Sequence, residues 1–152
     1  MLLTDARRLA DRIPEGLLAL FFRICVFSVF WRAGLPKWQN WDLTIALFQD
    51  EYLASLPFLP AAPIAYLAGT LEIVCSVLVL IGLGTRLAAL PLLGMTVFIQ
   101  LFVYWTSWPQ HILWAAILLY LIARGAGAWS FDGLLRHLAM RREDHAPGVS
   151  NG

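Results

Sequence analysis

Long apolar runs separated by short polar breaks dominate the chain. Each run has about 18–23 residues, and a helix of that length spans a hydrocarbon core of roughly 30 Å. Backbone groups in lipid must be hydrogen-bonded within their own segment, which favours helices. The pattern therefore predicts an all-α membrane protein. Its four-helix transmembrane bundle is expected to use residues 17–35, 61–83, 87–104 and 110–128.

The breaks between these runs predict the connections. Residues 82–86, Gly-Leu-Gly-Thr-Arg, form a short turn that makes the second and third helices antiparallel neighbours. The first connection is longer, and within residues 38–56 acidic residues are interspersed with apolar ones. That mixture is typical of an amphipathic helix lying in the membrane interface. We therefore expect an amphipathic interfacial segment between the first two membrane helices.

Three parts of the chain follow from this pattern. Residues 1–16 are expected to be an N-terminal cytoplasmic segment, and residues 17–135 the transmembrane domain. Residues 136–152 are polar toward their end and are expected to form a disordered cytoplasmic tail.

Composition supports a membrane protein over a soluble helical bundle. Hydrophobic residues make up 60% of the chain and charged residues 14%, against about 25% charged residues in soluble domains. Mean hydropathy is +0.70. The net charge of +1 gives no electrostatic reason to expect nucleic acid binding.

Basic residues predict the orientation through the positive-inside rule. If the N-terminus is cytoplasmic, only Arg32 and Lys37 fall on the outer side. The inner side then carries eight arginines, which are Arg7, Arg8, Arg12, Arg86, Arg124, Arg136, Arg141 and Arg142. Both termini are therefore expected to be cytoplasmic.

Two charged residues interrupt the apolar runs. Glu72 is the only charge within residues 61–83, and Arg23 lies within residues 16–33. A charge at the centre of a membrane helix costs roughly 2.5–3.5 kcal/mol on insertion scales, so a retained one usually serves structure or function. Small residues around Glu72 let helices approach closely, so Glu72 is expected to face the bundle interior.

Two interpretations of these charges remain open. Counting residues places Arg23 about 9 Å and Glu72 about 16 Å from the inner edge, so a direct ion pair, or separate hydrogen bonds from each residue, could hold the helices together. Alternatively, the polar groups line a ligand site. Thr96, Gln100 and Tyr104 recur every fourth residue on the third helix. The candidate ligand-binding residues are Arg23, Glu72, Gln100 and Tyr104.

Other reactive side chains carry weaker signals. Cys25 and Cys75 fall at similar depths, so a disulfide requires only that their faces meet, although free cysteines are commonly buried as small hydrophobic residues. His111 is interpreted as a helix-end residue. No cluster has the spacing of a metal site. No catalytic motif is present, and the sequence leaves open whether the protein is an enzyme.

Polar and glycine residues form a recognisable pattern along residues 17–135. They are Arg23, Gly34 with Lys37, Glu72, the turn at 82–86, and the Gly-x-Gly-x-x-Ser-x-Asp sequence from Gly125 to Asp132. In these residues the chain resembles the DoxX family of small bacterial membrane proteins. The resemblance implies four helices in the inner membrane. The family's recurring polar positions match Arg23, Lys37, Glu72, Arg86, Ser130 and Asp132, without a catalytic role for any of them.

The resemblance also implies a range of functions. The wider clan includes a thiosulfate:quinone oxidoreductase subunit and a methylamine-utilisation membrane protein, and family members are linked to redox stress, sulfur and copper handling. We expect an accessory or quinone-interacting subunit of a membrane redox system, with a quinone as candidate cofactor. The alternative is a non-catalytic membrane anchor, chaperone or small-molecule permeation module. The lipid bilayer is an expected partner. A redox or periplasmic protein and a homo-oligomer remain open.

Overall fold

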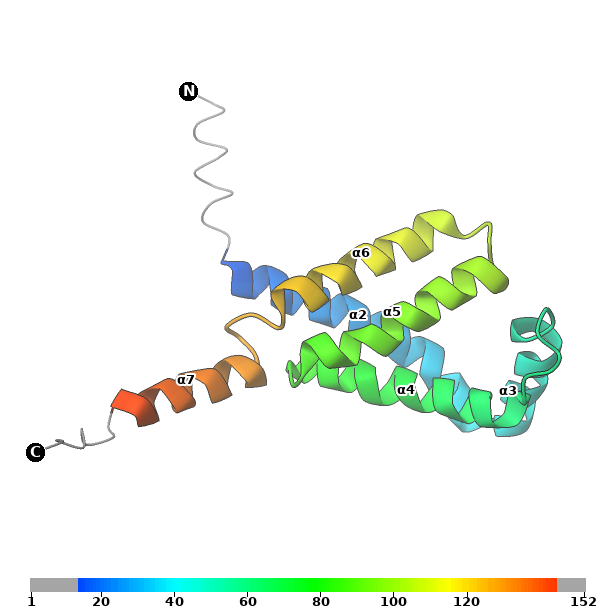
Figure 1. Ribbon diagram of the computed structural model, residues 1–152, viewed down its shortest axis with the longest axis horizontal. Coiled ribbons are helices and arrows are strands. Elements are labelled where there is room, and N and C mark those ends of the chain that lie inside the picture. The colour runs from blue at the N-terminus through cyan, green and yellow to red at the C-terminus, as the bar shows by residue number, and fades with distance from the viewer. Residues whose placement is uncertain (1–13, 145–152) are drawn as a thin grey trace, which may run out of the picture.

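The computed structural model describes residues 14–144, and every regular element within them is helical (Figure 1). Four long helices lie side by side, and a short helical segment closes one end of the molecule. The elements in chain order are α2 (Glu15–Gln39), α3 (Trp41–Leu47), the π-helix η1 (Phe48–Tyr52), α4 (Ala61–Ile81), α5 (Thr85–Phe102), α6 (Trp108–Arg124) and α7 (Phe131–Asp144).

Helix α2 is longer than the sequence predicted. We expected it to end at residue 35, directly before Pro36, and proline inside a helix removes a helical hydrogen bond. The helix instead continues through Pro36 to Gln39. Two contacts with α4 hold this last turn: Lys37 pairs with Glu72, and the Trp38 indole N–H donates to the Gly69 carbonyl at 3.2 Å. Tertiary contacts thus override the local effect of proline.

The connection after α2 is helical, as expected, but it is divided into two short elements. Asn40 separates α2 from α3 and caps α3, its side chain accepting a hydrogen bond from the Leu43 N–H at 3.0 Å. Phe48 and Leu53 are buried against Ala65 of α4. This segment therefore closes the end of the molecule at which α2 ends and α4 begins (Figure 1).

A tight turn joins α4 to α5. Gly82, at φ +75°, ends α4 with its N–H bonded to the Leu78 carbonyl at 3.0 Å, and Gly84, at φ +57°, precedes α5. Both angles lie in the left-handed region that favours glycine. The turn makes α4 and α5 antiparallel, as the sequence predicted. Helix α6 then packs against both α5 and α2.

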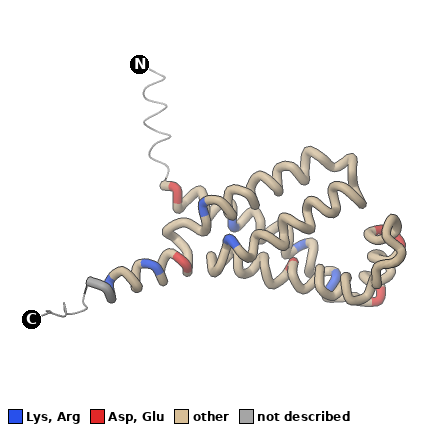
Figure 2. The backbone as a smooth tube through the Cα atoms, viewed as in Figure 1, with Lys and Arg blue, Asp and Glu red and all other residues tan. Residues whose placement is uncertain are grey.

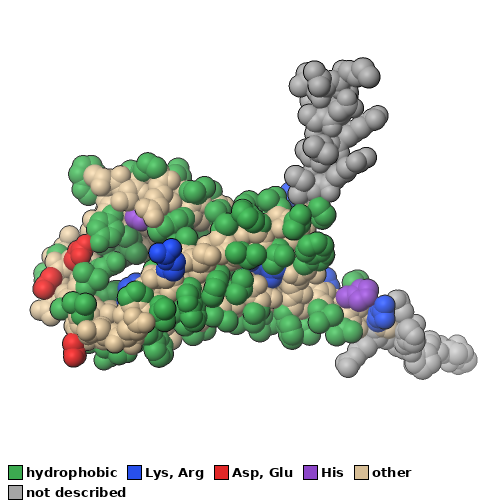
Figure 3. Space-filling model, turned by 180° about the vertical axis from the view of Figure 1, so that it is seen from behind, with side chains coloured by type: hydrophobic (Ala, Val, Ile, Leu, Met, Phe, Trp, Pro, Cys, Tyr) green, Lys and Arg blue, Asp and Glu red, His purple; other side chains and the backbone are tan. Residues whose placement is uncertain are grey.

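Apolar side chains cover much of the outer surface (Figure 3). Leu67, Leu87 and Leu101 are 61%, 75% and 58% exposed. Three helices, α2, α4 and α5, are long and apolar enough to cross a membrane. The fourth run is shorter than predicted: α6 has 17 residues and ends at Arg124, before the positive-φ residue Gly125. The chain therefore has membrane-spanning helices that contact the lipid bilayer, while the expected count of four spans is not confirmed.

The two ends of the molecule carry most of the charged residues, and a few more lie along the helices between them (Figure 2). The acidic residues Asp42, Asp50 and Glu51 lie in α3 and η1. Arg86 lies in the first turn of α5, Arg124 is the last residue of α6, and Arg136 lies in α7. These basic residues are at the opposite end of the molecule. Arginines are thus concentrated at the α7 end, which also carries the acidic Glu15 and Asp132, while Lys37 lies toward the α3 end.

Helix α7 differs from the sequence expectation. The expected disordered tail began at residue 136, but α7 extends from Phe131 to Asp144 and projects from the other helices (Figure 1). The expectation of disorder is therefore wrong for residues 136–144. The remainder of that tail, and most of the expected segment 1–16, lie outside the described residues.

Close packing of α2 on α4 leads to a stability prediction. A Cβ added to Gly34 would lie 3.0 Å from Glu72 Cβ and from Ile73, whereas one added to Gly94 of α5 would meet no atom within 4 Å. We expect Gly34→Ala to cost about 1–3 kcal/mol through overpacking. The control Gly94→Ala should stabilise α5 by roughly 0.5–1 kcal/mol. Thermal unfolding in one detergent, followed by circular dichroism, measures both; equal melting temperatures would contradict the packing.

Candidate functional site

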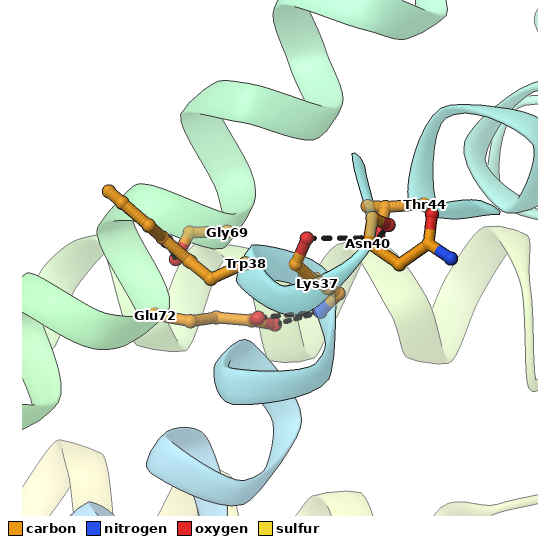
Figure 4. Close-up of polar contacts among 6 residues, drawn as sticks. All are labelled: Lys37, Trp38, Asn40, Thr44, Gly69 and Glu72. Carbon is orange, nitrogen blue, oxygen red and sulfur yellow. Dashed lines mark hydrogen bonds and ion pairs between the residues drawn. The ribbon is translucent and has the colours of Figure 1, made fainter. Parts of the chain in front are cut away.

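A buried ion pair joins α2 to α4 (Figure 4). Lys37 Nζ lies 2.6 Å from Glu72 Oε1 and 2.5 Å from Oε2, so the ammonium contacts both carboxylate oxygens. Lys37 is 8% exposed and Glu72 only 3%. Glu72 therefore faces the interior, as the small residues around it predicted.

Two glycines allow the pair to form. Gly34 lies three residues before Lys37 and Gly69 three residues before Glu72, which places each glycine beside the charge on its own helix face. A Cβ on Gly34 would crowd Glu72 Cβ at 3.0 Å, and one on Gly69 would contact Lys37 Cβ at 3.5 Å. Each helix thus makes room for the charged residue of the other.

The turn that follows Lys37 fixes its backbone. Thr44 Oγ1, buried at the start of α3, lies 3.2 Å from the Lys37 carbonyl and 2.8 Å from the Asn40 carbonyl, to either of which it can donate (Figure 4). Trp41 packs against Gly69 and against the Tyr66 ring, at a centroid distance of 4.5 Å. The lysine is therefore held at the end of α2 instead of extending into the solvent.

An apolar slot ends at this ion pair. It has a volume of about 390 Å³ and lies between α4, α5 and η1. Lys37, Tyr52 and Glu72 supply its polar groups, while leucine, isoleucine, methionine, phenylalanine and other apolar side chains form the rest of its wall. Leu67 belongs to this wall and is 61% exposed. The slot therefore reaches the lipid-facing surface.

A second cavity lies on another side of the same pair. It has a volume of about 340 Å³ and is lined from α2, η1, α4, α5, α6 and the α5–α6 turn. Its wall is much more polar, with Thr96, Tyr104, Ser107, Gln110 and His111 joining the three polar residues of the slot. The surface in Figure 3 is hollowed toward the end that carries the acidic side chains. Lys37, Tyr52, Glu72 and Ile99 line both spaces.

Two tyrosines border the polar cavity. Burial raises the pKa of Tyr52, and the negative charges of Glu72 and Glu51 raise it further. The Tyr104 hydroxyl donates a hydrogen bond to Glu51, and this bond, with burial and neighbouring groups, raises the pKa of Tyr104 to about 12. Both phenols are therefore protonated at neutral pH and can donate hydrogen bonds. The Lys37 ammonium lies 6.0 Å from the centre of the Tyr52 ring, within cation–π range.

Gln100 takes part in a separate polar contact at the same end. Its Oε1 lies 2.7 Å from His111 Nδ1, and its amide nitrogen donates to the Trp105 carbonyl at 2.8 Å. Gln100 does not line the two cavities that meet at the ion pair, but its partner His111 lines the polar one. Its amide orients the histidine ring.

Arg23 does not pair with Glu72, so the direct ion pair expected from the sequence is wrong, while the alternative of separate hydrogen bonds between helices agrees with the structure. Its guanidinium donates to the Leu80 carbonyl at 3.2 Å and to the Trp129 carbonyl. Leu80 lies eight residues beyond Glu72, or about 12 Å along α4. The residue count placed the two charges close enough to meet but missed the nearer partner, Lys37, on the same helix as Arg23.

The remaining family-pattern residues gather around Arg23 at the α7 end. Asp132 accepts hydrogen bonds from the N–H groups of Gly84 and Thr85, at 2.9 and 3.4 Å, and so ties α7 to the α4–α5 turn. Ser130 Oγ donates to the Gly127 carbonyl at 2.6 Å. Arg86 borders Gly125, where an added Cβ would lie 3.3 Å from its Nε. These contacts make a structural junction.

The cysteines and potential metal ligands form no further site in residues 14–144. Both cysteines are free thiols: Cys75 is buried in the core, and Cys25 lines a small apolar cavity between α2 and α6. No group of three or more His, Cys, Asp or Glu side chains in this range is placed to hold a metal ion.

Comparison with known proteins places the chain in a family. The DoxX family model matches residues 18–105, a range that contains Lys37, Glu72, Tyr52 and both cavity-lining faces of α4 and α5. The chain belongs to the DoxX family. An uncharacterized protein of Haemophilus influenzae is 30% identical over 139 residues, which cover 82% of this chain and 87% of the relative. No solved structure matches.

Some site residues of this DoxX protein were missed from the sequence. Lys37 was noted as a family position but was counted as an outer basic residue, although Gly34 three residues earlier placed a gap on its helix face. Tyr52 was treated as part of an amphipathic segment, and His111 as a helix-end residue. All three residues lie toward the same end of the chain's helices in the sequence-based prediction. That position gives their depth along the helices but does not show which helix faces contact one another.

The ion pair leads to a double-mutant prediction for the DoxX protein. Lys37→Met or Glu72→Gln alone leaves one buried charge unpaired and should cost about 3–5 kcal/mol. The double change removes both charges and should recover much of that loss. Melting temperatures in one detergent measure the cycle. Arg23→Gln with Glu72→Gln is the matched control and should be additive; coupling there, and additivity for Lys37 with Glu72, would contradict the pairing.

Proposed function

We propose that this DoxX protein binds a small lipophilic molecule with a polar head group, of the quinone class, in the apolar slot. It would act as an accessory or quinone-interacting subunit of a membrane redox system. The observation that carries this proposal is the apolar cavity of about 390 Å³ that ends at a buried ion pair and a tyrosine. Ligand pockets commonly combine such an apolar wall with a few converging polar groups.

The polar end of the slot fits a quinone head group. The Lys37 ammonium and the Tyr52 hydroxyl are donors for the two carbonyl oxygens of a quinone. Glu72 is an acceptor for the hydroxyl group of the corresponding quinol and can exchange a proton with it. The polar groups therefore complement both redox forms. The apolar wall suits the ring substituents and the isoprenoid chain.

The slot is also placed to receive its ligand from the membrane. Leu67 combines slot lining with high exposure on the lipid-facing surface of α4. A molecule dissolved in the bilayer could enter sideways between α4 and α5 without crossing water. The chain carries no recognisable electron carrier, so a redox protein partner supplies or removes electrons in this proposal.

The proposed arrangement in the membrane uses α6 as a fourth span beside α2, α4 and α5. Both termini lie in the cytoplasm and the protein resides in the bacterial inner membrane, because the basic residues of α5, α6 and α7 then lie on the inner side. The acidic α3 and η1 lie at the outer interface. A periplasmic partner would contact the protein there.

A permeation module is the second candidate function, and one observation favours it. The apolar slot and the polar cavity share Lys37, Tyr52, Glu72 and Ile99, so together they approach a path from the outer end to the lipid-facing side. Passage of a solute would require these shared side chains to move. Solute flux into proteoliposomes without a partner protein would support this function over quinone binding.

Filling the slot tests the proposed ligand. Gly94 lines the slot, and an added Cβ would meet no atom there within 4 Å. Gly94→Phe should therefore place a ring in the cavity without displacing the backbone. Wild-type protein at a quinone concentration of 100 times Kd gains about 2.7 kcal/mol from binding. We expect Gly94→Phe to lose this gain, measured as the melting-temperature shift with a short-chain ubiquinone analogue.

The matched control is Leu90→Phe on the same helix. Leu90 is 50% exposed and does not line the slot, so this variant should keep the wild-type shift. A ligand-free melting temperature for each variant shows that it is folded. An equal quinone shift in wild type and Gly94→Phe, or no shift in wild type with quinones of several chain lengths, would overturn the proposal.

A further inference from the structure

The quinone site proposed above uses the apolar slot and assigns no function to the polar cavity beside the ion pair. We propose that it is a water-filled vestibule through which water, protons and small polar solutes reach Lys37 and Glu72 from the outer end of the molecule. The inference rests on the proposed function only in taking this pair as the functional centre. It adds an aqueous entrance to a site whose other opening faces lipid.

The lining of the cavity is polar enough to retain water. Eight of its thirteen lining residues have polar or charged side chains, against three of fifteen in the apolar slot. A cavity retains water when it is polar and large enough, and one water needs about 10–15 Å³ and two to four polar partners. At about 340 Å³ the vestibule meets the size requirement many times over.

The cavity extends from one end of the molecule to the buried ion pair. Ser107 lines it from the α5–α6 turn and Gln110 from the first turn of α6, where Gln110 is exposed. Glu72 and Thr96, which are 3% exposed, line its interior. The cavity therefore connects the end of the molecule with the middle of α4 and α5, along a wall that includes His111 and Tyr104. Figure 3 shows the molecule hollowed toward this end.

Water in the cavity would lower the free-energy cost of burying the two charges. Two ions buried in a dry interior cost several kcal/mol each, and water penetration is one of the terms that lowers this cost. The ammonium of Lys37 has three donors, and both of its hydrogen bonds within the described residues end on Glu72. Tyr52 from η1, Tyr104 after α5 and His111 from α6 are the other titratable groups that line the vestibule. A vestibule water can bridge them to the pair.

Neighbouring residues on α5 provide a matched test. Thr96 is buried and lines the vestibule, whereas Val97 is 46% exposed on the lipid-facing surface of the bundle. Thr96→Cys and Val97→Cys are made in a Cys25→Ala/Cys75→Ala background. A charged, membrane-impermeant methanethiosulfonate reagent is then added to intact cells. Only the thiolate reacts, and each pKa unit by which lipid burial raises a thiol's pKa slows the reaction about tenfold.

We expect Thr96→Cys to react at least about tenfold faster than Val97→Cys, although Thr96 is the more buried residue. Gln110→Trp at the mouth should slow labelling of Thr96→Cys and leave the exposed control Asp50→Cys unchanged. Ala33→Cys is a second vestibule position if Thr96→Cys does not fold. Inverted vesicles give the same comparison if Asp50→Cys is unreactive in cells.

Equal, slow labelling of Thr96→Cys and Val97→Cys would overturn the vestibule. The vestibule would also be overturned if Thr96→Cys is labelled fast and Gln110→Trp does not slow that labelling. This outcome is separate from failure of the proposed function, which is measured by the quinone-dependent melting shift and its loss in Gly94→Phe. A wet vestibule without quinone binding would leave the aqueous entrance intact and point to the permeation function.

Discussion

The burial of two opposite charges between α2 and α4 is the constraint on which the α3 end of the structure depends. Each charge alone would be expensive in a low-dielectric interior, so the arrangement requires short contacts from Lys37 to both oxygens of Glu72. That requirement brings α2 and α4 so close together that Gly34 and Gly69 leave no room for larger side chains at their contact. It also keeps α2 helical beyond Pro36 and places Trp38 and Trp41 against Gly69. The outer helical segment then closes over the pair.

The opposite end of the molecule uses a different solution. Arg23 is 1% exposed, and its two terminal guanidinium nitrogens donate to backbone carbonyls at the end of α4 and before α7, while its buried Nε has no hydrogen-bond partner among the described residues. Asp132 is bound by N–H groups of the α4–α5 turn. These residues fasten the helix ends, so the family's recurring polar positions divide into a structural junction and an ion pair that faces two cavities. The ion pair faces the apolar slot and the polar cavity, while Arg86 and Asp132 of the junction line a separate cavity of about 460 Å³ together with Arg136.

The sequence was sufficient for much of the fold and for one member of the site. Apolar run lengths predicted the long helices, the Gly-Leu-Gly-Thr-Arg turn predicted antiparallel α4 and α5, and small neighbours predicted that Glu72 faces inward. Its partner could not be predicted from depth along a helix, because depth does not show which faces meet or that α2 continues past Pro36. The helical form of residues 136–144 was missed because polar composition was taken as a sign of disorder.

The central claim is that Lys37 and Glu72 contact a ligand as well as join two helices. The most direct measurement is the affinity of the Lys37→Met/Glu72→Gln double variant for a short-chain ubiquinone analogue, compared with wild type at matched folded fractions. Hydrogen bonds to charged groups contribute about 1.5–3 kcal/mol, so the account predicts that Kd rises at least about tenfold while the variant stays folded. An unchanged Kd in the folded double variant would contradict it and leave the pair with a structural role alone.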